Sequence, residues 1–214
     1  MSSGKTSGVQ VSTGHYFDSG YLHPSRLASY GYQFREIDSR DCESVIEVGV
    51  GADVLRFLLE RSGVKVETLD IDESLDPDIV GSVTNIPRPT NSVDAVLGFQ
   101  VLEHLPFENF GAALREMKRV AREYVMISLP DVSRCYRFDN WFPVIGHVRF
   151  ELRIPRIHPP EHEYDGQHYW EIGKKGYSKQ RIKEKIQTAG LTIEDSYRPW
   201  EYAYHHFFIL RAET

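Results

Sequence analysis

Short apolar runs and amphipathic stretches alternate along the chain. The runs at 45–48, 64–69, 93–99 and 124–129 are apolar and rich in β-branched residues, a pattern that predicts strands buried on both faces of a sheet. Apolar residues recur at helical spacing over 24–37, 53–63 and 110–121. Strand and helix thus alternate four times. This order predicts an α/β fold with a parallel sheet, helices on both faces and a site at the carboxyl ends of the strands.

The remaining parts of the chain define the expected domain organisation. Residues 1–22 are predicted to form a flexible tail, and their aromatic residues together with helix 24–37 either cover the sheet edge or act as a lid over a ligand. We expect one domain over 23–214. The segment at 131–176 is crowded with proline, histidine and aromatic residues without a clear period, so we interpret it as an insertion. After it, a helix beginning at Ser178 and a closing antiparallel hairpin are predicted.

Composition limits the class of protein. The chain has 214 residues, 41% of them hydrophobic, which argues against a disordered protein. Its net charge of −6 argues against non-specific binding to nucleic acids or anionic membranes. No apolar run approaches the roughly 18 to 20 residues of a membrane span, and no signal-peptide core is present, so we expect a cytoplasmic protein. Cys42 and Cys135 are too few for a disulfide framework or a four-thiolate zinc site.

The clearest chemistry lies where two predicted strands end. After the run at 45–48 the chain continues with Gly49 and Gly51, which permit a tight turn and close approach of the backbone to a ligand. The helix that follows would point its free N–H groups at that ligand. Asp70 ends the next run, nineteen residues past Gly51, where a carboxylate can accept hydrogen bonds from both hydroxyls of a ribose. We therefore expect a nucleotide-type site between these two strand ends.

Five segments resemble, in consecutive order, motifs of the class I S-adenosylmethionine (SAM)-dependent methyltransferases of the type 11 group. They are I-E-V-G-V-G at 46–51, V-E-T-L-D at 66–70, G-S-V-T-N-I-P at 81–87, N-S-V-D-A-V at 91–96 and F-Q-V-L-E-H-L at 99–105. The resemblance covers roughly 44–130. It implies a Rossmann-like doubly wound sheet of seven strands, mostly parallel with the last strand antiparallel, and SAM as cofactor with S-adenosylhomocysteine as product.

The resemblance also implies which residues contact the cofactor. They are Glu47, Gly49 and Gly51 at the methionine end, Gln100 beside the methionyl portion, Asp70 at the ribose, Ile71 and Val83 on the two sides of adenine, and Ser82 near its amino group.

Two departures from the family pattern keep other functions open. Asp53 stands where the first motif usually has its third glycine, and Ser82 stands where an acid is usual. A SAM-binding fold that has lost its chemistry and acts as a partner or scaffold is one alternative. A nicotinamide-dependent dehydrogenase is another, since it shares the Gly-x-Gly turn and the downstream acid. That fingerprint, however, requires glycine where this chain has Val54, and it does not explain Glu47.

The acceptor side of the site is defined by fewer residues. A sulfonium methyl is already activated, so the enzyme mainly aligns the acceptor with it and excludes water. His104, which follows the run at 93–99, is a candidate base; the alternative is a histidine that only bonds to backbone at a helix start. The His-rich stretch at 158–171 either closes over the acceptor or packs on the surface. Its catalytic candidates are His162 and His168, and the candidate substrate-binding residues are Tyr169, Trp170 and, earlier in the insertion, Trp141.

No metal site is expected in this stretch. His158 and His162 do not form the His-Glu-x-x-His pattern, and the prolines between them argue against a helix. The aromatic residues of the insertion favour a small or medium-sized acceptor over a folded nucleic acid. The expected partner is therefore a small-molecule substrate, with neither a membrane nor a nucleic acid involved.

Overall fold

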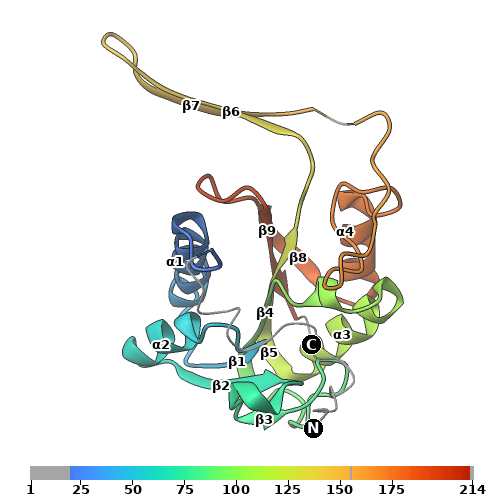
Figure 1. Ribbon diagram of the computed structural model, residues 1–214. Coiled ribbons are helices and arrows are strands. Elements are labelled where there is room, and N and C mark those ends of the chain that lie inside the picture. Colours follow the sequence, from blue (N-terminus) through green and yellow to red (C-terminus); the bar gives the residue numbers. More distant parts are fainter. Residues whose placement is uncertain (1–19, 155, 213–214) are drawn as a thin grey trace, which may run out of the picture.

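A single seven-stranded sheet organises the chain (Figure 1). The computed structural model describes residues 20–154 and 156–212. The sheet has the order β3-β2-β1-β4-β5-β9-β8, in which β1 to β5 pair in parallel and β9 runs antiparallel to both β5 and β8. This confirms the predicted α/β class and the reversed last strand. The strands are β1 Ser44–Val48, β2 Lys65–Asp70, β3 Ile79–Val80, β4 Val93–Phe99, β5 Ala121–Pro130, β8 Thr192–Tyr197 and β9 His205–Arg211.

The helices cover both faces of this sheet. They are α1 Pro24–Asp38, α2 Val54–Arg61, α3 Phe107–Val120 and α4 Lys179–Thr188, with short 3₁₀ turns η2 Glu73–Leu75 and η3 Leu102–His104. Figure 1 shows α1 and α2 on one side and α3 and α4 on the other. Local sequence explains two of the helix starts. Pro24 occupies the first turn of α1, and the Ser178 hydroxyl accepts the Arg181 N–H at the start of α4.

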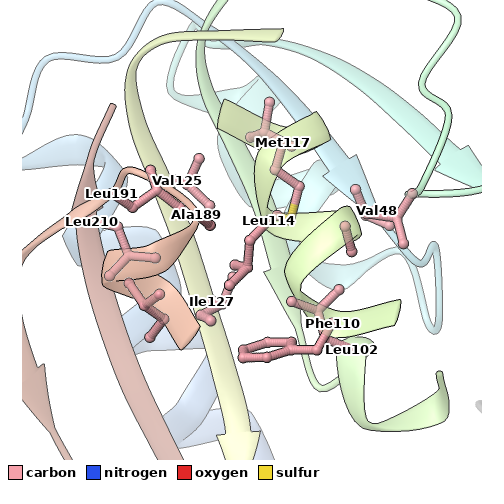
Figure 2. Packing of buried hydrophobic residues seen from close by; sticks show 14 of the residues in the cluster. Val48, Leu102, Phe110, Leu114, Met117, Val125, Ile127, Ala189, Leu191 and Leu210 are labelled. Atoms are coloured by element: carbon pink, nitrogen blue, oxygen red, sulfur yellow. The ribbon is translucent and has the colours of Figure 1, made fainter. Parts of the chain in front are cut away.

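The core lies in two layers, one on each face of the sheet. Because successive strand residues point to opposite faces, Ile46 and Val48 of β1 join the layer under α3 and α4, whereas Val45 joins the layer under α1 and α2. Figure 2 shows side chains of α3, among them Leu114, directed toward Ile127 of β5. Burying each such side chain stabilises the fold by about 1.5–3 kcal/mol. This double-sided packing holds the strand ends in register at the site.

Part of the insertion forms an element that the sequence analysis does not predict. Strands β6 Cys135–Phe142 and β7 Gly146–Arg153 pair in an antiparallel hairpin that projects away from the sheet (Figure 1). At its base, Arg137 donates hydrogen bonds to the carbonyl oxygens of Pro199 and Trp200. The guanidinium groups of Arg137 and Arg149 lie 5.0 and 4.8 Å from the centre of the Trp200 ring. These contacts attach the hairpin to the loop between β8 and β9.

The expectations for the tail and for membranes meet the structure only in part. Residues 1–19 of the predicted tail lie outside the described residues. Over 20–154 and 156–212, no helix combines the length and the apolar character that crossing a bilayer requires.

Candidate active site

A cavity of about 550 Å³ opens at the carboxyl ends of β1, β2 and β4. In the strand order, the chain proceeds outward from β1 to β3 and then returns to the other side of β1 with β4. Such a reversal leaves a crevice, and it is where open α/β sheets bind their ligands. The predicted site residues that line the cavity are Glu47, Gly49, Gly51, Asp70, Ile71, Ser82, Val83, Gln100, His104, His168 and Tyr169.

The glycine turn after β1 has little room for side chains. Gly49 has φ +83°, and a Cβ atom on it would lie 2.7 Å from Cγ2 of Val101 in the loop after β4. Asp53 has φ +57°, a left-handed conformation that aspartate tolerates better than most residues. The residue that replaces the family's third glycine therefore keeps the backbone conformation that a glycine would adopt. Helix α2 begins directly after it.

Asp70 joins the two strand ends. Its Oδ2 accepts the Val50 N–H at 3.0 Å, and its Oδ1 accepts the Asp72 N–H at 2.9 Å. The carboxylate at the end of β2 thus contacts the glycine turn at the end of β1, as the sequence predicts. Each carboxylate oxygen has a second lone pair with which it can accept a hydrogen bond from a ligand.

Glu47 places a buried carboxyl group on the wall of the cavity. Its Oε2 has no hydrogen-bond partner among the described residues. Burial, and then the negative charge of Asp53, raises the pKa of Glu47 to about 8, against the opposing effect of Arg56. A buried polar atom without a partner costs about 1–3 kcal/mol. The arrangement therefore favours a ligand that donates a hydrogen bond to this carboxyl group.

The loops after β2 and β4 form a further part of the cavity wall. Ile71 is 45% exposed and Val83 is buried, and both line the cavity. The Ser82 hydroxyl lies 2.8 Å from that of Thr84. Gln100 has φ +58°, and its side-chain amide donates to the Ser128 hydroxyl at 3.1 Å. A non-glycine residue held in this region stores strain of the kind found at ligand sites, and here a strand neighbour fixes its side chain.

Two histidines occupy the other end of the cavity. His104 Nδ1 donates to the carbonyl oxygen of Gln167 at 3.1 Å, and its ring centre lies 5.0 Å from that of His168. Burial, and then the charge of His168, lowers the pKa of His104 to about 4. His168 Nδ1 lies 3.2 Å from Glu171 Oε1. Burial alone would lower the pKa of His168, but the bond to Glu171 and the Glu103 charge outweigh it, so this pKa is raised.

Glu103 is a site residue to which the sequence analysis gives no role. Its side chain is fully buried, and neither carboxylate oxygen has a hydrogen-bond partner in the described part of the chain. Burial raises the pKa of Glu103 to about 7. The available signal was its position beside His104, directly after β4. Other lining residues include Tyr21, Arg26, Tyr30 and Gln33 in and before α1, and Tyr204 and His205 before and in β9.

Helix α1 contacts both the core and the cavity. Ile37 is fully buried in the core layer under α1 and α2, whereas Tyr30 lines the cavity. The helix therefore packs on the sheet and also forms part of the cavity wall.

Three predicted acceptor-side residues do not line the cavity. His162 lies behind it, with Nε2 2.8 Å from the carbonyl oxygen of His168. Trp170 is fully buried against Phe107 and Phe110, and its indole N–H donates to the carbonyl oxygen of Leu105. Trp141 lies on β6 and is 68% exposed. Trp170 thus packs in the core and Trp141 lies on the projecting hairpin, so neither side chain lies where an acceptor contact was predicted.

Comparison with known proteins gives a family match for part of the chain. Residues 46–127, from β1 into β5, match the family described as "Methyltransferase domain". A search of curated proteins found no match.

Several solved structures share the fold at low sequence identity. One is a 1,6-didemethyltoxoflavin-N1-methyltransferase from Burkholderia thailandensis, with a TM-score of 0.59 and 13% identity over 93% of this chain and 86% of that chain. Another is a magnesium protoporphyrin IX methyltransferase from Synechocystis, with a TM-score of 0.58 and 13% identity over 87% and 83%. A SAM-dependent methyltransferase from Aquifex aeolicus has a TM-score of 0.57 and 17% identity over 95% and 100%. Residues 46–127 thus match a methyltransferase-domain family, and the chain shares its overall fold with SAM-dependent methyltransferases.

Proposed function

We propose that the protein binds SAM in the cavity at the ends of β1, β2 and β4 and transfers its methyl group to a small or medium-sized acceptor. The observation that carries this proposal is the 3.0 Å hydrogen bond from Val50 N–H to Asp70. It brings the glycine turn and the Asp70 carboxylate to one cavity, whose wall also holds a carboxyl oxygen of Glu47 that has no hydrogen-bond partner within 20–154 and 156–212. Similar structures contain bound S-adenosylhomocysteine, which supports the same ligand class here.

Each part of the cofactor has a chemical counterpart in the cavity. Asp70 would accept hydrogen bonds from the ribose hydroxyls, and Glu47 from the ammonium group of the methionine end. Ile71 and Val83 would cover the two faces of adenine, with Ser82 near its amino group and Gln100 beside the methionyl portion. The backbone at Gly49 and Gly51 would let this end approach closely.

The cavity supports a small-molecule acceptor. Its volume of about 550 Å³ lies within the range of about 300–1,000 Å³ that is usual for small-molecule sites. Two of the similar structures are enzymes named for small molecules, 1,6-didemethyltoxoflavin and magnesium protoporphyrin IX.

When bound, SAM supplies a methyl group already activated on a sulfonium, so the chain has mainly to orient the acceptor and exclude water. Tyr21, Tyr30 and Tyr169 line the cavity and provide large ring surfaces for this purpose. His104 and His168 also line the cavity and carry imidazole nitrogens. We propose these two as the histidines that act on the acceptor, while His162 supports the backbone of His168.

Two observations favour this function over the alternatives. The left-handed backbone of Asp53 preserves the turn, so this departure from the family motif gives no reason to expect loss of cofactor binding. The match to a methyltransferase family spans both predicted cofactor strands, which favours SAM over a nicotinamide cofactor.

Calorimetric titration with SAM, S-adenosylhomocysteine and NAD tests the proposal. We expect binding of the first two and not of NAD. Asp70→Ala should raise the Kd for SAM at least about tenfold, because a hydrogen bond to a charged group contributes about 1.5–3 kcal/mol. The Kd for SAM of Asp70→Asn, which retains one acceptor oxygen, should lie between the values for the wild type and Asp70→Ala. Glu73→Ala is the matched control, since Glu73 is an exposed acid of the same loop outside the cavity wall. Unchanged SAM affinity in Asp70→Ala would refute the assignment.

A further inference from the structure

Glu103, His104 and His168 form a compact cluster on the cavity wall. One potential ligand atom from each lies within 4.8 Å of the others. Glu103 and His104 belong to η3, directly after β4, whereas His168 comes from the insertion. A backbone hydrogen bond of 2.9 Å from Tyr169 N–H to the Glu103 carbonyl oxygen holds the two segments together. The cluster is therefore part of the fold and not a chance meeting of mobile side chains.

Both imidazole rings are oriented through Nδ1. A carbonyl oxygen can only accept, so the bond from His104 to Gln167 puts the proton on Nδ1 and the lone pair on Nε2. His168 Nδ1 pairs in the same way with the Glu171 carboxylate, which in turn accepts the Tyr204 hydroxyl at 2.7 Å. Histidines that bind metals show this arrangement, in which a carbonyl or carboxylate behind the ring fixes its orientation and tautomer.

The third member supplies negative charge. Glu103 is fully buried, and within the described residues both of its carboxylate oxygens lack a hydrogen-bond partner. An ionised carboxylate in this position is costly unless a cation or several donors compensate it. A metal ion held by this carboxylate and the two imidazoles would do so.

We propose that Glu103, His104 and His168 bind one divalent transition-metal ion. Two imidazole nitrogens with one carboxylate suit first-row ions such as Zn²⁺, Co²⁺ and Mn²⁺, whereas Mg²⁺ and Ca²⁺ prefer oxygen ligands alone. Three protein ligands leave at least one coordination position for an external donor. All three residues line the cavity, so an acceptor there can supply that donor. This last step rests on the proposed methyl transfer and favours an acceptor that carries an oxygen or nitrogen donor near the methylated atom.

A metal ion at this cluster differs from the expectation of no metal in the sequence analysis. That expectation rested on the spacing of residues within 158–171, because the ligands of a helical motif lie close together in the sequence. Here one ligand comes from that stretch and two come from the turn after β4, so the set exists only in the folded chain.

Titration of the untagged, chelator-treated full-length protein with Co²⁺ tests the site, with visible absorption reporting coordination and equilibrium dialysis reporting stoichiometry. We expect one Co²⁺ per chain, displaced by Zn²⁺ but not by Mg²⁺. Glu103→Gln and His168→Ala should weaken Co²⁺ binding about 10–100-fold. Glu171→Gln, which acts through His168, should weaken it at least about tenfold. His158→Ala is the matched control, an exposed histidine of the same insertion outside the cluster, and should bind like the wild type.

Absence of a coordinated Co²⁺ spectrum in the wild type would overturn the proposal, and so would equal binding in Glu103→Gln. Circular dichroism shows whether each variant is folded. If His168→Ala unfolds, the wild-type spectrum and the isosteric Glu103→Gln decide the matter. SAM titration of the metal-free protein separates the two proposals. If the wild type binds SAM but no Co²⁺, only the metal site is refuted. If it does not bind SAM, the proposed function is refuted.

Discussion

At the scale of single residues, the approach of Val101 to Gly49 sets the geometry of the glycine turn. A Cβ on Gly49 would lie 2.7 Å from Val101 Cγ2, and φ there is +83°. Gly49→Ala should therefore lower the free energy of unfolding by about 1–3 kcal/mol and weaken SAM binding, because the turn must shift. Urea denaturation and calorimetry measure the two effects. Val101→Ala in the same chain removes the clash and should restore only the steric part of the loss.

Gly63 provides the control for this experiment. Its φ is +94°, but a Cβ there meets nothing within 4 Å, and it does not line the cavity. Gly63→Ala should thus show the backbone cost alone, about 1 kcal/mol, with SAM affinity unchanged. If Gly49→Ala lowers the free energy of unfolding no more than Gly63→Ala and binds SAM like the wild type, the close approach of Val101 does not affect stability or SAM binding.

Residues were predictable from sequence where their role depends on a local motif. Gly49, Gly51 and Asp70 stand at strand ends that hydrophobic patterning reveals, and they meet at one cavity. Glu103 and His168 were different, because their relation depends on an insertion folding back onto η3, which no local spacing encodes. The burial of Trp170 had the same origin, since it follows from packing against α3.

At the scale of elements, the hairpin of β6 and β7 is separate from the cofactor site. None of the hairpin side chains that the structure describes lines the cavity. Replacing 136–152 by a short Gly-Ser linker should therefore leave the Kd for SAM within about twofold of the wild-type value, as expected for distant sites. The linker is feasible because Cys135 and Arg153 are paired across the hairpin. Calorimetry on the shortened chain measures the affinity, and a tenfold loss in a folded variant would show that the hairpin reaches the site.

The hairpin also shows where patterning was insufficient. The alternation V-R-F-E-L-R-I at 148–154 is typical of a strand, but it lies among prolines and histidines. Its apolar residues Phe150 and Leu152 are each 53% exposed, so they do not pack into a core. Strands of the main sheet were found because burial on both faces demands continuous apolar runs. Even so, β5 begins at Ala121, directly after α3 and earlier than predicted, since no turn residue separates them.

At the scale of the whole molecule, the stability of the ligand-free protein should depend on Glu47. The pKa of Glu47 is raised to about 8 in the folded protein, from an ordinary value of 4.5. Between these values the folded state keeps a proton that the unfolded state releases. The Glu47 contribution is therefore fully present below about pH 4.5 and is lost as pH rises toward 8, with a slope of up to about 1.4 kcal/mol per pH unit. Glu47→Gln should remove this part of the slope in urea denaturation.

The difference in pH dependence between Glu47→Gln and the wild type separates the effect of Glu47 from that of other buried carboxyl groups. Glu73→Gln, at an exposed position, should retain the wild-type pH dependence. An identical slope in Glu47→Gln and the wild type would mean that Glu47 is already ionised in the folded protein near neutral pH.

The segment at 167–170 is tied to the core at two points, by the backbone bond from Tyr169 to Glu103 and by the buried indole of Trp170. This part of the cavity rim is consequently a rigid frame anchored to the turn after β4, and not a swinging flap. If the protein is the methyltransferase proposed above, its acceptor selectivity would depend on side chains carried by this frame, such as Tyr169, so substrates could change by exchange of these side chains while the path of the loop stays the same.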